Sequence, residues 1–235
     1  MGAISEPYMY EYMMSNGLHL VKIDGELFII DTGSPVSFTF DEKNKLTLKT
    51  LPFELSVNLL GIKKEDIDKL AGVDVAGLIG FDIINKEGLT IDKKTHAVMF
   101  EADDLYGYTQ LPVRMLSVMG IGLMDMECEI GGQTVKSIFD TGASVGYVHK
   151  SLIGDAEYVG EVEDFGPSFG GEIKTSKYKI EVAIGDMTVS TELAKMTFAV
   201  ESQVGLLGYK AILGLNDFEW ERVVIDPFEE KVAFC

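Results

Sequence analysis

The most constraining feature of this sequence is an internal duplication. Residues 28–38 read FIIDTGSPVSF, and residues 137–147 read SIFDTGASVGY. The two segments lie 109 positions apart, and apolar residues agree on both sides of the shared Asp-Thr-Gly. A long-range match of this kind predicts that the chain folds into two similar halves.

A second matched pair follows the first in each half. Residues 78–81 read LIGF and residues 212–215 read ILGL, now 134 positions apart. The second half therefore carries 25 additional residues between its two motifs. Chance is a poor explanation, because one Asp-Thr-Gly is expected only about 0.05 times in a chain of this length.

The local patterns indicate an all-β fold. Residues 20–23 and 27–30 flank Asp24-Gly25, which predicts a hairpin. Residues 127–130 and 134–139 flank two glycines in the same way, and residues 178–184 alternate between apolar and other residues as in a half-buried strand. Short helices are expected at 63–71, 82–86 and 216–221.

The duplication also predicts the domain organisation. We expect an N-terminal lobe at residues 1–105 and a C-terminal lobe at residues 106–235. The segment 101–110 contains acidic residues and a glycine between the two copies, and is the expected linker. The predicted architecture is therefore all-β and bilobal, with a cleft between two homologous lobes.

Composition limits the classes of partner. Acidic residues outnumber basic ones by 38 to 20, giving a formal net charge of −18, which argues against nucleic acid and anionic membranes. The longest stretches without a charged residue have ten positions, whereas a membrane helix needs about 18. The N-terminal residues contain neither the basic nor the apolar segment of a secretory signal, so we expect a cytoplasmic protein.

No metal or other cofactor is expected. The sequence contains no His-Glu-x-x-His, Cys-x-x-Cys or Gly-x-Ser-x-Gly motif, so zinc and serine chemistry have no support. The two cysteines, Cys128 and Cys235, are too few for a disulfide framework. The chemistry must therefore come from the duplicated motifs themselves.

Two aspartates placed face to face have a chemistry that one aspartate lacks. Carboxyl groups a few ångströms apart share a proton, so we expect the pKa of one to rise and that of the other to fall. One of Asp31 and Asp140 could then take a proton from a water molecule while the other protonates a carbonyl. Gly33 and Gly142 leave room for backbone amides, and Gly80 and Gly214 for a close strand.

Thr32 and Thr141 are expected to support the pair. Each threonine has a hydroxyl that could hydrogen-bond across to the other lobe. Such bonds would fix the relative position of the two aspartates, which a reaction shared by two groups requires.

These motifs resemble those of the aspartic protease superfamily. The resemblance rests on Asp31-Thr32-Gly33-Ser34 and Asp140-Thr141-Gly142-Ala143, each followed by an apolar-apolar-Gly, and covers residues 18–100 and 125–235. Two motifs in one chain are similar to the pepsin arrangement, whereas each half is near the size of a retroviral-type subunit. The resemblance implies a catalytic dyad of Asp31 and Asp140. It also implies that the Ser34 hydroxyl bonds the Asp31 carboxylate; Ala143 lacks that hydroxyl, so the two acids should differ.

The resemblance further implies a flap, a Gly-tipped hairpin over the cleft. The candidate lies in the longer interval of the second half and consists of Phe165, Gly166, Pro167, Ser168, Phe169, Gly170 and Gly171. Residues 51–61 occupy the corresponding interval of the first half and have no glycine-rich tip. We therefore expect one flap, from the second lobe, which departs from both pepsins and retroviral enzymes.

The function that follows is an aspartic endopeptidase that binds an extended peptide or protein substrate. A monomer suffices for the active site, because one chain supplies both motifs. The alternative is a catalytically idle peptide-binding or regulatory module on the same fold, since a flap is missing from the first lobe. The retention of both acids argues against this alternative, although fold alone does not decide function.

Overall fold

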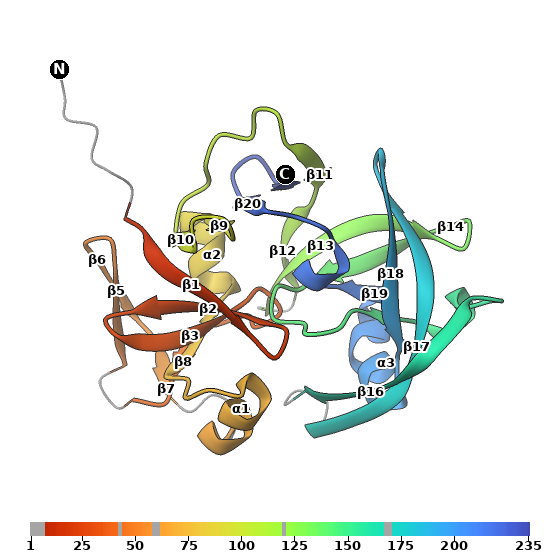
Figure 1. The fold of residues 1–235 in the computed structure, drawn as a ribbon, viewed down its shortest axis with the longest axis horizontal. Helices are drawn as coiled ribbons and strands as arrows, with labels where there is room; N and C mark the ends of the chain where they lie inside the picture. The colour runs from red at the N-terminus through yellow and green to blue at the C-terminus, as the bar shows by residue number, and fades with distance from the viewer. Residues whose placement is uncertain (1–7, 42–43, 58–61, 119–120, 167–170) are drawn as a thin grey trace.

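Strands supply most of the regular structure, as the sequence predicts. The computed structural model describes residues 8–41, 44–57, 62–118, 121–166 and 171–235. In these residues the chain alternates between paired strands and short helical turns (Figure 1). The strands of the first half lie on the left of Figure 1 in red to yellow, and most of those of the second half lie on the right in green to blue.

The first half consists of short strands and two helices. Its strands are β1 (Tyr10–Ser15), β2 (Leu18–Ile23), β3 (Glu26–Asp31), β4 (Phe38–Thr39), β5 (Lys45–Leu48), β6 (Leu51–Glu54), β7 (Ser56–Val57), β8 (Gly77–Gly80), β9 (Leu89–Asp92) and β10 (Ala97–Met99). Its helices are α1 (Lys64–Ala71) and α2 (Phe81–Glu87), close to the two helices expected there.

The second half contains the longer strands. They are β11 (Thr109–Pro112), β12 (Arg114–Val118), β13 (Ile121–Ile130), β14 (Gln133–Phe139), β15 (Tyr147–Val148), β16 (Glu157–Gly166), β17 (Gly171–Ile184), β18 (Met187–Lys195), β19 (Tyr209–Leu213), β20 (Arg222–Asp226) and β21 (Lys231–Phe234). The helical segments are η2 (Lys150–Leu152), α3 (Phe198–Val204), η4 (Gly205–Leu207) and η5 (Leu215–Asp217). The sequence indicates a turn or two at 216–221, and one 3₁₀ turn, η5, forms there.

The first hairpin shows why the sequence dictates its turn. Strands β2 and β3 pair with Ile23 opposite Glu26, so Asp24 and Gly25 form a two-residue connection. Both residues have positive φ, 52° and 90°, as a type I′ turn requires. Glycine and aspartate tolerate that backbone region better than most residues, which is why this dipeptide predicted the hairpin correctly.

Each Asp-Thr-Gly motif follows a central strand that pairs in parallel with an apolar-apolar-Gly strand. In the first half β3 pairs with β8, with Asp31 opposite Gly80. In the second half β14 pairs with β19, with Phe139 opposite Leu213. The two motifs of each half are therefore neighbours in space, and both halves have the same local arrangement.

Glycine is required where these strands meet the aspartate loops. A Cβ atom on Gly80 would lie 2.8 Å from the carbonyl oxygen of Ser34, and one on Gly214 would lie 2.7 Å from that of Ala143. Real side chains do not approach backbone oxygens this closely. The sequence-based expectation for these two glycines is confirmed.

One large sheet takes strands from both halves. Its order is β11-β21-β20-β9-β10-β1-β2-β3-β8-β4-β7, whereas β12-β13-β14-β19-β15-β18-β17-β16 form a second sheet and β5-β6 a small third one. Strand β20 pairs with β9, with Val223 opposite Ile91. This pairing joins the two expected ranges, 1–105 and 106–235, in one sheet. The lobe boundary expected near residue 105 stays a prediction.

The tip of a hairpin from each half also reaches the opposite half. Gly17, between β1 and β2, accepts a hydrogen bond at its carbonyl from the Asn216 side chain at 2.7 Å. Gly122, at the start of β13, lies so close to Phe81 that a Cβ would be 2.1 Å from the ring. The β16–β17 hairpin likewise approaches α1 at the bottom of Figure 1, where Lys69 and Glu172 form an ion pair of 3.1 Å. The two halves therefore contact each other at three places besides the shared sheet.

Candidate active site

Asp31 and Asp140 occupy equivalent positions at the ends of two buried strands. Asp31 is the last residue of β3, and Asp140 directly follows β14 and donates its backbone amide to the Leu213 carbonyl at 2.8 Å. The residues before them, Ile30 and Phe139, are fully buried. The apolar strands therefore carry both aspartates from the core to one partly exposed position between the two halves.

A single backbone amide connects the two carboxylates. The N–H of Gly33 donates to Oδ1 of Asp31 at 2.8 Å and to Oδ1 of Asp140 at 3.1 Å. Each carboxylate accepts the amide two residues after it in sequence. For Asp31 this is the Gly33 amide, and for Asp140 it is the Gly142 amide, which donates to Oδ1 at 2.8 Å. The structure thus brings the two acids within reach of one donor, although they lie 109 positions apart in the sequence.

The two loop glycines face the aspartate of the opposite half. A Cβ atom on Gly33 would lie 2.3 Å from Oδ2 of Asp140, and one on Gly142 would lie 2.3 Å from Cγ of Asp31. Only a residue without a side chain fits in either place. Sequence reasoning assigned these glycines to the approach of backbone amides and missed that each makes room for the acid of the other half.

Thr32 and Thr141 link the two loops beneath the carboxylates. The hydroxyl of Thr32 donates to the Phe139 carbonyl at 3.0 Å, and that of Thr141 donates to the Ile30 carbonyl at 3.0 Å. Each hydroxyl also accepts the amide of the other threonine, at 2.9 and 3.0 Å. Both side chains are completely buried. This reciprocal network fixes the distance between the two aspartates.

The role expected for the Ser34 hydroxyl is wrong. Its Oγ donates to the carbonyl of Val36 at 2.8 Å, and the group that reaches Asp31 Oδ1 is the Ser34 backbone amide at 3.0 Å. The loop turns so tightly after Asp31 that the amide points at the carboxylate and the side chain points along the loop. Ala143 donates its amide to the Asp140 carbonyl at 3.2 Å.

Burial raises the pKa of both carboxyl groups. The rise carries the pKa of Asp31 well above its usual range, and the nearby charge of Asp140 adds to it. For Asp140, burial raises the pKa while hydrogen bonds from Asp31, Gly142 and Gly33 oppose the rise. The expectation that one pKa falls is therefore wrong, because desolvation outweighs these hydrogen bonds. A hydrogen bond between the two carboxyl groups adds to the rise of the Asp31 pKa and opposes the rise of the Asp140 pKa.

A cleft of about 530 Å³ lies over the two carboxylates and takes its walls from both halves. Asp31, Gly33, Ser34, Asp140, Gly142 and Ala143 form part of its lining. The remaining lining is mostly apolar, with Leu18, Ile29, Ile67 and Leu78 from the first half and Leu123, Ile138, Val204 and Ile212 from the second. An elongated apolar ligand with polar main-chain groups matches such a surface.

The hairpin formed by β16 and β17 reaches the cleft. Its two strands pair down to Gly166 opposite Gly171, and Phe165 and Gly166 line the cleft. Ser168, Phe169 and Gly170, with Pro167, lie outside the described residues. Gly171 has a φ of +105°, which favours glycine at that position.

The corresponding interval of the first half contributes nothing to the cleft among its described residues. Strands β5 and β6 form a hairpin with Leu48 opposite Leu51. Lys49 in its turn contacts Glu101 at 3.2 Å, and its amide bonds the Tyr10 hydroxyl at 2.7 Å. Residues 58–61 lie outside the described part of the chain.

Four further polar side chains line the cleft, those of Ser144, Tyr147, Asp164 and Gln203, and the sequence analysis missed them. Asp164 of β16 accepts hydrogen bonds from the Ser144 hydroxyl at 2.9 Å and the Tyr147 hydroxyl at 2.6 Å. The charge of Asp164 contributes to the raised pKa of Asp140. Asp164 lies in the longer interval of the second half, on a hairpin that has no counterpart among the first-half residues that line the cleft. The internal duplication therefore does not point to Asp164, and no other signal in a single sequence does.

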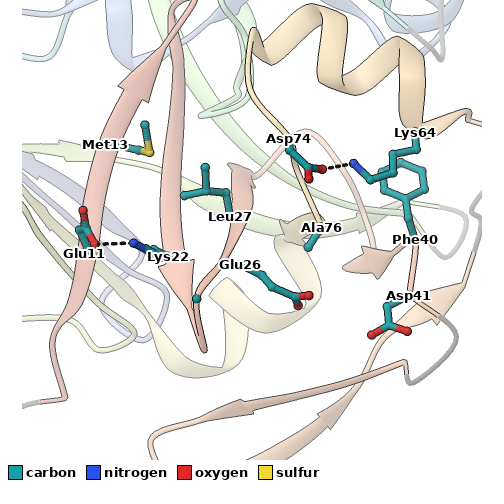
Figure 2. Close-up of a pocket in the computed structure, with 11 residues that line it drawn as sticks. Glu11, Met13, Lys22, Glu26, Leu27, Phe40, Asp41, Lys64, Asp74 and Ala76 are labelled. Atoms are coloured by element: carbon teal, nitrogen blue, oxygen red, sulfur yellow. Dashed lines mark hydrogen bonds and ion pairs between the residues drawn. The ribbon is translucent and has the colours of Figure 1, made fainter.

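A second cavity, of about 570 Å³, shares no lining residue with the cleft (Figure 2). It lies on the first half, and four of its charged side chains form ion pairs. Glu11 contacts Lys22 at 3.3 Å, and Lys64 forms ion pairs with Asp74 and Asp68. This cavity is not part of the candidate active site.

The described residues contain neither a metal cluster nor a membrane helix. Within residues 8–41, 44–57, 62–118, 121–166 and 171–235, no three His, Cys, Asp or Glu side chains stand together as a metal site would need. In the same part of the chain, no helix has the length and apolar character needed to cross a bilayer.

Comparison with known proteins places the fold. No family model and no curated protein sequence matches this chain. The crystal structure of an aspartic proteinase from Irpex lacteus matches with a TM-score of 0.57 and 11% sequence identity, over 98% of this chain and 97% of that chain. The solution structure of the simian foamy virus (mac) protease matches with a TM-score of 0.30 and 18% identity, over 40% of this chain and 89% of that chain. This chain therefore has the two-lobed β fold of a pepsin-like aspartic proteinase.

Proposed function

We propose that this protein is an aspartic-type endopeptidase with Asp31 and Asp140 as its catalytic dyad. The observation that carries the proposal is the Gly33 amide, which donates to Oδ1 of both carboxylates at 2.8 and 3.1 Å. Two acids that share one donor at the floor of a cleft can hold one water molecule between them. The fold match supports the same class of reaction.

The proposed reaction uses one proton shared between the two acids. Asp31 carries the proton, and the ionised Asp140 accepts a proton from the water as the water oxygen bonds to the peptide carbonyl carbon. Asp31 gives its proton to the carbonyl oxygen, which yields a tetrahedral diol. The carbon–nitrogen bond then breaks as Asp140 protonates the leaving amine and the diol returns a proton to Asp31.

The surroundings of the dyad fit this mechanism. The reciprocal bonds of Thr32 and Thr141 prevent the two loops from moving apart, so both proton transfers keep their geometry. The β16–β17 hairpin acts as the flap, and Phe165 and Gly166 cover the bound peptide. The flap excludes water other than the one that reacts.

The cleft selects an extended peptide with apolar side chains next to the cleaved bond. Leu78 and Ile29 line it from the first half of the chain, and Ile138 and Ile212 line it from the second half. Burial of a large apolar side chain contributes about 1.5–3 kcal/mol. The peptide main chain pairs with the flap in the manner of an added strand.

A second candidate is a peptide-binding module without catalysis. One observation favours it: the β5–β6 hairpin of the first half supplies none of the residues that line the described cleft, so the described first half has no hairpin over the cleft. The buried, amide-bonded carboxylates weigh against it, because a binding module gains nothing from the cost of burying two acids.

A peptide library separates the two candidates. The protein is incubated with the library from acidic to neutral pH, with and without a statine-type inhibitor, and the products are sequenced. Asp31→Asn and Asp140→Asn are each expected to lower kcat/KM by about 10²–10⁴ and to leave the fold intact. Asp155→Asn, at an exposed position, serves as the matched control. Full activity in either dyad variant would sink the proposal, and inhibitor binding without any cleavage would favour the binding module.

A further inference from the structure

The cleft wall contains one carboxylate that the proposed reaction does not use. Asp164 projects from the flap strand β16 and accepts the Ser144 hydroxyl at Oδ1, 2.9 Å away, and the Tyr147 hydroxyl at Oδ2, 2.6 Å away. All three residues line the same cleft as the dyad. Asp164 and Ser144 are partly exposed, whereas Tyr147 is 3% exposed.

Both partners of Asp164 are neutral. Each hydroxyl occupies one lone-pair direction of the carboxylate, which can accept about four hydrogen bonds in total. A hydroxyl donor orients an anion but leaves its charge uncompensated. Among the residues that the structure describes, no lysine, arginine or histidine forms an ion pair with Asp164.

The whole described lining of the cleft likewise has negative charges and no positive ones. It contains three carboxylates, Asp31, Asp140 and Asp164, and no Lys, Arg or His. Two cationic residues of the flap hairpin are engaged elsewhere: Lys174 contacts Glu163 at 2.8 Å and Lys177 contacts Glu192 at 2.6 Å. A ligand that enters the cleft with a positive charge would therefore meet an anion that no described lining residue neutralises.

We propose that Asp164 is a specificity-determining residue that selects substrates with a lysine or arginine side chain in the subsite beside the second Asp-Thr-Gly loop. The inference rests on the proposed peptidase function and refines its substrate class. An ammonium or guanidinium group bonded to Asp164 keeps both hydroxyl bonds and adds a charge-assisted one. Asp164 is separate in the lining from the apolar residues Ile29, Leu78, Ile138 and Ile212, so a basic residue at Asp164 leaves those apolar subsites to the residues that flank the cleaved bond.

The rival interpretation gives Asp164 a purely structural role. In that case its bonds to Ser144 and Tyr147 only anchor the flap strand to the Asp140 loop. Loss of the anchor would then weaken every substrate equally. The ratio between a basic and a neutral substrate tells the two interpretations apart, because only a specificity residue changes it.

The first test uses the unmodified protein and pairs of peptides. Within each pair, one position around the cleaved bond carries lysine or its uncharged isostere norleucine. We expect lysine to raise kcat/KM by about 10-fold to 100-fold at one position, the range expected for a hydrogen bond to a charged group. Cleavage with no preference for lysine at any position overturns the inference and leaves the peptidase proposal standing.

A binding measurement keeps the inference testable without turnover. Statine-type peptides with lysine or norleucine at each position are titrated into the protein, and their dissociation constants are compared. A tighter complex with one lysine peptide supports the inference, whether or not the protein cleaves peptides. Equal dissociation constants at all positions overturn it.

Variants then assign the preference to Asp164. Asp164→Asn is expected to bring the lysine-to-norleucine ratio close to one. Glu163→Gln is the matched control, because it removes an equal charge from the adjacent residue of the strand, whose side chain pairs with Lys174, and it should keep the wild-type ratio. Tyr147→Phe loses one anchor but keeps the charge, so its ratio should also stay high. If Asp164→Asn retains the full ratio, the assignment is wrong.

Discussion

The Thr32 hydroxyl accepts the Thr141 amide at 2.9 Å, and the Thr141 hydroxyl accepts the Thr32 amide at 3.0 Å. Each hydroxyl then donates to a carbonyl of the other half, at Phe139 or Ile30. These hydrogen bonds therefore join residues that are more than a hundred positions apart, in a place without exposure to solvent. The relative position of the two halves at the dyad depends on this network.

Replacement of either threonine should destabilise the protein and slow the proposed reaction. Thr32→Val and Thr141→Val keep the side-chain shape but leave a buried amide and a buried carbonyl without partners. Each should lower the free energy of unfolding by about 1–3 kcal/mol per unpaired group. Denaturant titration measures this cost, and peptide cleavage measures the effect on kcat.

A double-mutant cycle tests whether the threonines act together. Because they share bonds, the cost of the double variant should differ from the sum of the single costs by more than about 0.5 kcal/mol. Thr134→Val, at an exposed position of β14, is the control and should change stability little. Strictly additive costs would contradict the network.

Gly33→Ala should disable the dyad. The new methyl group would lie 2.3 Å from Oδ2 of Asp140, so the carboxylate must move away from the shared amide. We expect kcat/KM to fall by at least about 10²-fold, because small displacements at a reacting centre have effects of that size. Gly205→Ala is the control, since its nearest neighbouring atom is 3.8 Å away and its φ is −65°. Wild-type turnover in the Gly33→Ala variant would show that the loop geometry is not required.

The sequence predicts the framework well, because local physics determines it. Asp24-Gly25 specifies a type I′ hairpin through its backbone preferences, and the apolar residues before Asp31 and Asp140 place both acids at strand ends. The duplication then brings the two motifs together by symmetry. These features depend on a few neighbouring residues, so a single sequence contains them.

The rest depends on contacts that no local pattern specifies. The direction of the Ser34 hydroxyl follows from the tightness of one loop, which turns Oγ toward Val36. The position of Asp164 follows from the path of a hairpin that reaches the cleft from one half only. The sign of the Asp140 pKa shift requires the balance between burial and hydrogen bonds in the folded chain. Each of these is a tertiary property.

Asp217 should make stability depend on pH. Its side chain is 7% exposed, and burial raises its pKa from 3.8 to about 6, against opposing bonds from Gly214 and Thr191. A raised pKa in the folded state favours folding below pH 3.8, and this contribution is lost as pH rises through about 6. At pH 7 the ionised group costs about 3 kcal/mol.

The test for Asp217 compares free energies of unfolding between about pH 3.5 and 7. Asp217→Asn can still accept the Gly214 amide and can donate to Thr191, so its stability relative to wild type should rise as pH increases from about 4 to 6. Asp186→Asn, in the exposed turn between β17 and β18, is the control. A constant difference across this range would contradict the prediction.

His19 should have the opposite effect over a similar range. It is fully buried beside Tyr12, and burial, with the nearby charge of Lys93, lowers its pKa from 6.5 to about 4. In the unfolded chain His19 binds a proton below pH 6.5, whereas in the folded chain it binds one only below about pH 4. Stability is therefore lost as pH falls through this window, by about 3 kcal/mol in total.

His19→Gln should flatten this part of the stability profile. The comparison uses the difference between variant and wild type at each pH, so that the constant cost of the altered core cancels. The difference should shift in favour of the variant from pH 6.5 down to about 4. His96→Asn, on an exposed turn, is the control. If the two profiles run parallel, His19 is not the responsible group.

The pairing of β9 with β20 has a consequence for the order of folding. In this pairing Arg222 lies opposite Asp92 and Ile225 lies opposite Leu89. The large sheet shared by both halves is therefore complete only when these segments, which are far apart in the chain, have met. Contacts of such long range slow folding, because the intervening chain must lose its freedom before they form. Before β20 pairs with β9, the edge of β9 can pair with strands of other molecules. An N-terminal fragment that lacks β20 would therefore be prone to aggregate through the β9 edge.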